Sequence, residues 1–417
     1  MFAKLFRQSD IPKRHHSNFK HLYLDIAWFG VLSGSAVNFL NIYAARLGAT
    51  GLQIGMLGAM TGVVNLFLAI PAGRWIERRH TGRAVFWSSI LFRFGYALWI
   101  PLPWLFNEQG QIWALIILTF LMAIPLTPLG VGFNALFAES VPGEYRAHVA
   151  GYRNVAFSIS FMFTSLFSGY ILKYISFPLG YQIIFLIGAI GAAMSSYHIF
   201  HIKPLQTDLL ATQSPPIPAA SGSGNSNRKI ESLMRLDIWS TPFRSVLLVL
   251  FGYHLTQYLA MPLFSIHYVR GIHLTDDEIG LGTAIFYLTV LIGSTQLRNI
   301  VHRLGHKTST GIGVAGMAIY PLSIALSHNA MHFYLTSLVG GFIFSISSGS
   351  YANYLLEKIP PSDRPAHLAW YNIILNSSIL IGSLAGPCLA EGIGFPAALM
   401  IFSFFRFLAG LAVLKWG

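Results

Sequence analysis

Charged residues are scarce in this chain. Only 10% of its 417 residues are Asp, Glu, Lys or Arg, whereas a soluble globular protein carries roughly 25%. Hydrophobic residues make up 54%. A chain of this composition cannot cover a water-facing surface with polar groups, so a soluble globular fold is excluded.

Cysteine is nearly absent as well. The one Cys, Cys388, lies inside an apolar run, so a disulfide framework is excluded. The sequence also has no cluster of residues at metal-ligand spacing, no cleavable signal peptide and no separate soluble domain. We therefore predict neither a metal nor a cofactor.

Long apolar segments are what the chain has in abundance. Each has about 20 residues or more, enough to cross a hydrocarbon core roughly 30 Å thick. They predict an all-α polytopic membrane protein with twelve transmembrane helices. The predicted spans are 22–46, 52–76, 84–103, 112–138, 150–173, 181–202, 243–268, 277–297, 308–327, 332–356, 367–390 and 396–415.

The net charge of +12 is distributed unevenly between the two sides of the membrane. Most Lys and Arg residues fall in the N-terminal tail and the loops on its side, and only Arg46, Lys173 and Arg270 fall at the other face. By the positive-inside rule, both termini are cytoplasmic. We predict a multi-pass protein of the cytoplasmic (inner) cell membrane, with the lipid bilayer as its surroundings and no nucleic-acid partner.

One long polar stretch divides the predicted spans six to six. Residues 203–241 contain Pro215-Pro216 and a Ser/Gly/Asn run, which is typical of a flexible linker. The predicted organisation is therefore a basic cytoplasmic tail (1–21), a six-helix bundle (22–202), a cytoplasmic linker (203–241) and a second six-helix bundle (242–417).

The two halves repeat one another at three places. Thr50 and Gln53 before the second span match Thr275 and Glu278 before the eighth, and both pairs predict a capping box at a helix start. The other matches are Glu139, Pro142, Arg146, His148 and Tyr152 with Glu357, Pro360, Arg364, His367 and Tyr371, and Gly82-Arg83 with Gly305-His306-Lys307. Three matches in the same order indicate a duplicated unit.

The segment after the second span carries Gly73, Glu77, Arg78, Gly82 and Arg83. With the twelve-span topology, this pattern resembles the signature of the major facilitator superfamily, although Glu stands for the usual Asp and two extra residues precede Gly82. The resemblance covers the whole chain and implies two six-helix bundles around a central cavity. We expect these five residues to form a cytoplasmic gate; the alternative is ordinary cytoplasmic charge without a gating role.

The fourth and tenth predicted spans are rich in Gly, Pro and Ser at matching positions of the two halves. In transporters built from repeats, interrupted helices of this kind point to the substrate site. We expect an irregular backbone here and include Asn134, Tyr351 and Asn353 among the cavity residues. The alternative is close helix packing through small residues.

Polar stripes in the first, seventh and eleventh spans supply the other cavity candidates. In the seventh, His254, Gln257, Tyr258 and Met261 follow helical spacing. The remaining candidates are Ser35, Asn38, Asn41, Trp370, Asn372 and Asn376. Their alternative role is hydrogen bonding between helices. Because histidine titrates near pH 6.5, about the working pH, His254 is also a candidate for proton coupling.

Three more charges lie inside predicted spans. Asp25 is either the partner of Arg153 in an ion pair or a proton-coupling carboxylate. Arg93 and Arg406 have no carboxylate in their own spans. They could bind an anion bidentately, but the resemblance implies that their helices are peripheral supports, which favours hydrogen bonds within the helix or to the backbone.

These observations favour a secondary or facilitative transporter of a small solute, with protons as an expected coupling partner and a monomer as the expected state. The 14% aromatic content slightly favours export of amphipathic compounds over proton-coupled uptake of a small metabolite. A membrane enzyme acting on lipid and a non-transporting sensor are the alternatives from other classes. The short loops and the lack of a clustered His/Asp/Glu constellation count against an enzyme.

Overall fold

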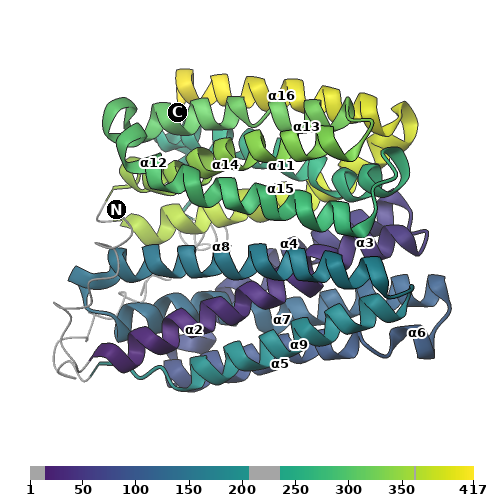
Figure 1. The fold of residues 1–417 in the computed structure, drawn as a ribbon. Helices are drawn as coiled ribbons and strands as arrows, with labels where there is room; N and C mark the ends of the chain where they lie inside the picture. The colour runs from purple at the N-terminus through teal and green to yellow at the C-terminus, as the bar shows by residue number, and fades with distance from the viewer. Residues whose placement is uncertain (1–14, 206–234, 361–362) are drawn as a thin grey trace, which may run out of the picture.

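The computed structural model describes residues 15–205, 235–360 and 363–417. These residues form helices and no strand. The long helices run roughly along one direction, with the N-terminal half in one layer and the C-terminal half in the other (Figure 1). The predicted all-helical fold of two bundles is confirmed.

Ten helices in the described ranges are long and apolar enough to cross a membrane. The shorter α5 carries Arg83 and Arg93. In the N-terminal bundle the helices are α2 (His16–Leu32), η3 (Ser33–Val37), α3 (Asn38–Arg46), α4 (Gly51–Glu77), α5 (Thr81–Leu98), α6 (Leu102–Leu105), α7 (Glu108–Ser140), α8 (Gly143–Tyr174) and α9 (Leu179–Phe200).

The C-terminal bundle follows the same order of long helices. Its elements are η4 (Leu236–Ser240), α11 (Phe243–Ile266), η5 (His267–Gly271), α12 (Asp276–Gly316), α13 (Ile319–Ala325), α14 (Ala330–Lys358), α15 (Arg364–Ile393) and α16 (Phe395–Trp416). Most of the predicted linker and most of the predicted basic tail lie outside the described residues.

The helix α12 contains the break between two predicted spans. Gly305 has φ 77° and ψ 165°, a conformation that is not helical and that a residue with a Cβ rarely adopts. The glycine of the second motif copy therefore separates an arm at 276–304 from an arm that begins at His306.

Both predicted capping boxes are present. The Thr50 hydroxyl accepts from the backbone N–H of Gln53, and the Gln53 side chain accepts from the Thr50 N–H at 2.8 Å. Thr275 and Glu278 make the equivalent pair at the start of α12. Each box satisfies backbone donors that a helix start leaves free.

The expected interruption of the fourth and tenth spans is wrong. Both α7 and α14 are continuous helices, although α7 contains Pro125 and Pro128. Hydroxyl groups in these helices bond back to carbonyls one turn earlier, as Thr127 does to Ala123 and Ser350 to Ile346. These bonds satisfy the polar side chains without an irregular backbone. The irregular turns lie instead in the first and seventh spans, as the π-helical segments η3 and η5.

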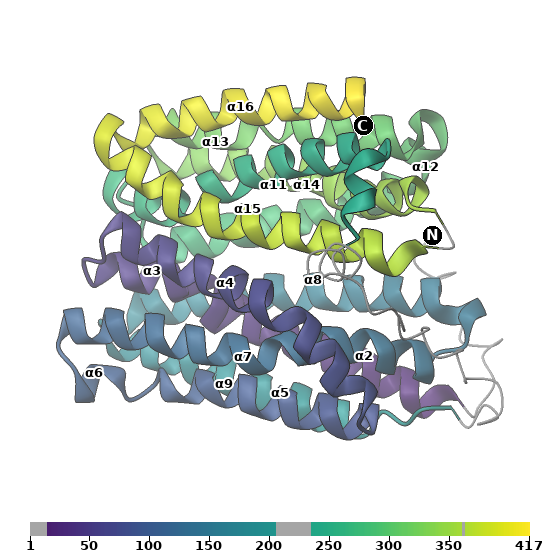
Figure 2. The ribbon, with the colours of Figure 1, turned by 180° about the vertical axis from the view of Figure 1, so that it is seen from behind.

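The two bundles meet mainly along two helix pairs, α4 with α15 and α8 with α12, and α11 also contacts α3 and α4. Figure 2 shows α4 and α15 side by side at the boundary between the layers. Glycines permit the close approach: a Cβ on Gly55 would clash with the Ser383 carbonyl, and one on Gly280 would lie 2.8 Å from the Ser165 carbonyl oxygen. Small residues therefore bring the bundles together, as in other membrane helix interfaces.

Candidate functional site

A cavity of about 400 Å³ lies between the bundles; we call it the main chamber. The helices η3, α3 and α8 face it from one bundle, and α11 to α14 and α16 face it from the other. Its polar side chains are Ser33, Asn38, Asn41, Gln257, Ser265, Thr283 and Arg406, and its aromatic ones are Phe161, Phe264, Tyr268, Phe286, Tyr287, Tyr320, Phe333 and Phe344. The chamber is apolar with a few polar groups, as binding sites for small molecules usually are.

A second cavity of about 350 Å³, the side chamber, adjoins the first. Val37, Asn41 and Met261 line both. The side chamber extends between α4, α5 and α7 of one bundle and Tyr258 and Ser383 of the other. A solute between the bundles would therefore contact both halves of the chain.

Four of the predicted cavity residues line these chambers: Asn38, Asn41, Gln257 and Tyr258. The π-helical turn η3 breaks the predicted polar stripe of the first span, so Ser35 does not face the chambers with Asn38 and Asn41. Ser35 is fully buried, donates to the Val31 carbonyl and packs against α9.

Other predicted cavity residues lie outside the two chambers. His254 is buried, with Nε2 3.1 Å from the Tyr371 hydroxyl and its ring beside Tyr351. Trp370 donates to the Arg235 carbonyl, and Asn376 accepts from Asn65 of α4 across the bundle boundary at 3.1 Å. The side chains of three further candidates are exposed: Asn134, Asn353 and Asn372.

Asp25 pairs with two arginines inside the N-terminal bundle. Its Oδ2 lies 3.1 Å from Arg153 of α8, and its Oδ1 lies 3.7 Å from Arg93 of α5. The Ser195 hydroxyl donates to the same carboxylate. The predicted pairing with Arg153 is present, and Arg93 finds its carboxylate on a different helix. Arg93 also donates to the Ser89 hydroxyl one turn earlier in its own helix. A hydrogen bond within the helix is what the supporting role predicts.

The four members of this cluster are buried and none lines either chamber. A buried carboxylate between two guanidinium groups fixes the helices that carry it. The geometry supports the structural interpretation of Asp25.

Ion pairs join the bundles at one end of the molecule, which we call the latch end. Arg46 pairs with Asp276 at 3.0 Å and Lys173 with Asp277 at 2.8 Å. Arg270 donates to the carbonyls of Ala45 and Ala49. The three basic residues predicted for the outer face thus all lie at this end.

The opposite end, where α2 begins and α9 and α16 end, is the linker end (Figure 1). In the described part of the chain, the side-chain hydrogen bonds between the bundles lie at the latch end or, for Asn65, near the middle of α4. The space beside Gly73 and Gly151 is open, since a Cβ at either position would have no other group within 4 Å. The bundles are therefore packed at the latch end and apart at the linker end.

The predicted gate motif lies at the linker end, across the last turns of α4 and the start of α5. Glu77, Arg78 and Arg83 are exposed, and Gly73 and Gly82 are partly exposed. Among the described residues, Glu77 has no ion-pair partner within 4.0 Å. In this conformation the motif closes no contact between the bundles.

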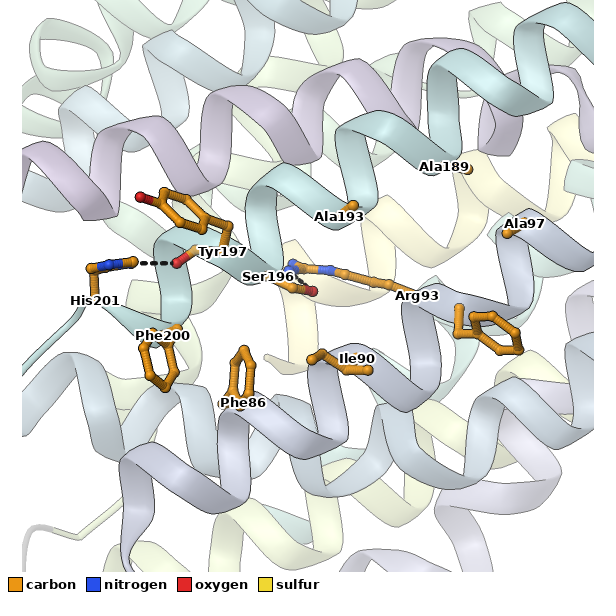
Figure 3. Close-up of a pocket in the computed structure, with 11 residues that line it drawn as sticks. Phe86, Ile90, Arg93, Ala97, Ala189, Ala193, Ser196, Tyr197, Phe200 and His201 are labelled. Carbon is orange, nitrogen blue, oxygen red and sulfur yellow. Dashed lines mark hydrogen bonds between the residues drawn. The ribbon is translucent and has the colours of Figure 1, made fainter.

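A larger groove of about 680 Å³ lies between α5 and α9 (Figure 3). Arg93 reaches across it to Ser196 at 3.1 Å, among the side chains of Phe86, Ile90 and Phe200. Phe94 and Phe200 are more than 60% exposed. Because the groove lies on one bundle alone, it has no access to the second half of the chain, and we assign it to the lipid-facing surface.

Sequence reasoning missed the latch as a contact. It placed Arg46, Lys173 and Arg270 at one face and identified the capping box that begins before Asp276, but the pairing joins residues up to 230 positions apart. It also missed Asn65 and the aromatic residues of the main chamber, which have no periodicity of their own to mark them.

The arrangement defines a class: a membrane protein of two helical bundles with a cavity between them. The family model described as Major Facilitator Superfamily matches residues 26–251 and 246–417. This chain belongs to the major facilitator superfamily, and it is a transporter rather than an enzyme. The lipid-enzyme alternative is thereby excluded.

Relatives of known name share low identity with the chain. The cis,cis-muconate transport protein of Acinetobacter baylyi is 21% identical over 364 residues, which is 86% of this chain and 82% of that protein. The quinolone resistance protein NorA of Staphylococcus aureus is 23% identical over 133 residues, or 32% of this chain and 34% of that protein.

Solved structures match the fold over nearly the whole chain. The crystal structure of a D-xylose-proton symporter has a TM-score of 0.71 at 17% identity and covers 96% of this chain and 97% of its own. A bacterial homologue of the iron transporter ferroportin in the inward-facing state has a TM-score of 0.69 at 15% identity, with 95% and 98% covered.

Proposed function

We propose that the chain moves a small amphipathic solute across the membrane by alternating access, with the main and side chambers as its binding site. The supporting observation is a cavity that both bundles line, at the junction of a packed end and an open end. A site between two bundles that rock against each other is reached from each side in turn.

The proposed orientation follows from charge. The basic residues Arg74, Arg78, Arg79 and Arg83 lie at the linker end, whereas only three basic side chains make the latch. By the positive-inside rule the linker end is cytoplasmic. The structure is then an inward-open state. The chain crosses the cytoplasmic membrane twelve times if α5 is counted and the span Asp276–Ala325 is divided at Gly305.

Substrate and direction belong to the proposal. The muconate relative matches most of the chain, and its name indicates a small unsaturated dicarboxylate. The NorA match covers a third of the chain, and its name indicates resistance to quinolones. The aromatic lining of the main chamber fits the unsaturated or aromatic body of either. Export remains the direction that the composition slightly favours, and proton-coupled uptake of a metabolite is the second candidate.

His254 and Asp25 are the two candidates for proton coupling that the sequence indicates. Asp25 has two basic partners away from the chambers, so a structural role is the better supported one. His254 is one helical turn from Gln257 of the main chamber. It stays our candidate for a proton site.

Flux into proteoliposomes tests the proposal. The purified chain, with Cys388 replaced by Ser, should raise the entry of labelled cis,cis-muconate or of a quinolone above that of protein-free vesicles. The matched control is the variant pair Arg46→Cys and Asp276→Cys, cross-linked across the latch. Flux should vanish on cross-linking and return on reduction; equal flux in both states would contradict alternating access through this interface.

A further inference from the structure

We propose that Arg406 is the anion-binding group of the main chamber and that the transported solute carries a carboxylate or a similar oxyanion. The inference rests on the proposed function and specifies its substrate class. It comes from the positive charge of Arg406 in the cavity, for which the described residues provide no carboxylate partner.

Arg406 is 5% exposed and lines the main chamber from α16. No carboxylate lies within ion-pair distance of it among the described residues, and its Nε has no hydrogen-bond partner. Its guanidinium carbon lies 5.6 Å from the centre of the Tyr253 ring. This contact with the π-face offsets part of the burial cost, but it leaves the N–H donors available.

The other intramembrane arginines provide the contrast. Arg93 and Arg153 share the carboxylate of Asp25 and hydrogen-bond to neighbouring helices. Those two share one carboxylate as their counter-ion within a structural cluster, whereas Arg406 has no carboxylate partner among the described residues. A buried charge without a counter-ion is costly, and such a charge inside a membrane protein usually marks a ligand or ion path.

Polar groups near Arg406 suit an anion. No Asp or Glu is among the described residues that line the two chambers. Gln257 lines the same chamber, and its side-chain Nε2 is a donor from which an anion can accept a hydrogen bond. An amide and a planar guanidinium can both donate to a carboxylate, the latter through two parallel hydrogen bonds.

The rest of the chamber selects the body of the solute. Aromatic rings such as Phe161, Tyr287 and Phe344 surround the polar groups. Phe161 and Tyr287 stack with centroids 3.9 Å apart across the bundle boundary. The structure thus assigns a small, flat, unsaturated or aromatic acid as the substrate class.

Three probes that share a benzene ring but differ in charge test the inference. They are benzoate (negative), benzamide (neutral) and benzylamine (positive). For the full-length protein in detergent at pH 7, benzoate should raise the melting temperature and the other two should not. In Arg406→Met the benzoate affinity should fall about 30-fold or more, as the loss of a buried charge-assisted pair predicts. Arg406→Lys, which keeps the charge but loses the planar fork, should be intermediate.

The stability of the free variant is a second readout. If Arg406 awaits a ligand, Arg406→Met removes an uncompensated charge, and the apo melting temperature should be unchanged or higher. A lower apo melting temperature together with unchanged benzoate binding would overturn the inference. So would stabilisation of the wild type by benzamide or benzylamine and not by benzoate.

Failure of the inference differs from failure of the proposed function. Proteoliposomes that take up benzylamine or benzamide through the protein, with Arg406→Met unaffected, would refute the anion site and leave the transporter intact. Saturable benzoate binding that needs Arg406, with no flux of any probe, would refute transport and leave the anion site.

Discussion

Arg46 and Asp276 lie 230 positions apart in the chain and form an ion pair of 3.0 Å across the boundary between the bundles. Arg46 ends the first span of one bundle, and Asp276 begins the eighth span in the other. Their contact, with Lys173–Asp277 beside it, holds the latch end closed while the linker end is open. It should therefore be formed in one conformation and broken in the other.

Arg46→Gln should shift the protein toward the conformation that is open at the latch end. The pair is partly exposed, so its loss is expected to cost about 0.2–1 kcal/mol, a population change of up to about fivefold. A cysteine at Asn41 of the main chamber, in a background without Cys388, should then react faster with a membrane-impermeant thiol reagent added at the latch side. Asp237→Asn, in an ion pair within one bundle, is the control and should leave the rate unchanged.

Gly55→Val should prevent closure of the latch end by a different route. A side chain there meets the Ser383 carbonyl of α15, and overpacking of this kind costs about 1–3 kcal/mol. Transport should slow strongly, since the closed state is part of the cycle. Gly130→Ala is the matched control, because no group lies within 4 Å of a Cβ at Gly130. Equal loss of transport in both variants would contradict the assignment of Gly55 to close contact between the bundles.

Asp25→Asn should destabilise the protein because it leaves Arg93 and Arg153 buried without a counter-ion. Removal of one partner from a buried ion pair typically costs about 3–5 kcal/mol. The melting temperature in detergent should fall, and the yield of folded protein should fall with it. Were the variant as stable as the wild type but unable to drive uptake with a pH gradient, Asp25 would be a proton carrier and our structural assignment would be wrong.

The sequence predicts helix positions well because hydropathy and capping are local. The boxes at Thr50 and Thr275 mark the residues that precede α4 and α12, and the apolar runs place the other helix ends within about seven positions. The positive φ of Gly305 is consistent with a glycine in the repeated motif, although the sequence alone did not require it.

The site is only partly predictable from the same information. Periodicity identifies the face of a helix but not the helix that the face will meet, so Asn41 and Gln257 were identified as cavity residues while the Asp25–Arg93 contact was missed. The π-helical turn at Ser33–Val37 changes which residues of the first span share a face. That local change in register separates Ser35 from Asn38 and has no clear signal in the sequence.

Glu77→Gln tests the predicted gate motif. In the structure Glu77 is exposed at the open end, so the variant should bind solute as the wild type does. If Glu77 pairs with an arginine only when this end closes, the transport rate should fall while the binding affinity is unchanged. Glu144→Gln, an exposed carboxylate at the start of α8, should have little effect. An unchanged transport rate in Glu77→Gln would contradict the gate assignment.

Alternating access requires that the two ends open in turn, and spin labels on both bundles measure this directly. One pair, at Glu108 and His328, reports on the latch end, and a second pair, at His80 and Asn299, reports on the linker end. All four positions are exposed, so labels there should not disturb the packing. Cys388 is replaced by Ser in every sample.

Electron–electron double resonance on these two pairs in lipid is the most direct test of the account. We predict that the wild type favours a short latch-end distance with a long linker-end distance, and that Gly55→Val reverses both populations together. A single fixed distance at each end, the same in wild type and Gly55→Val and indifferent to added benzoate, would contradict alternating access between these bundles.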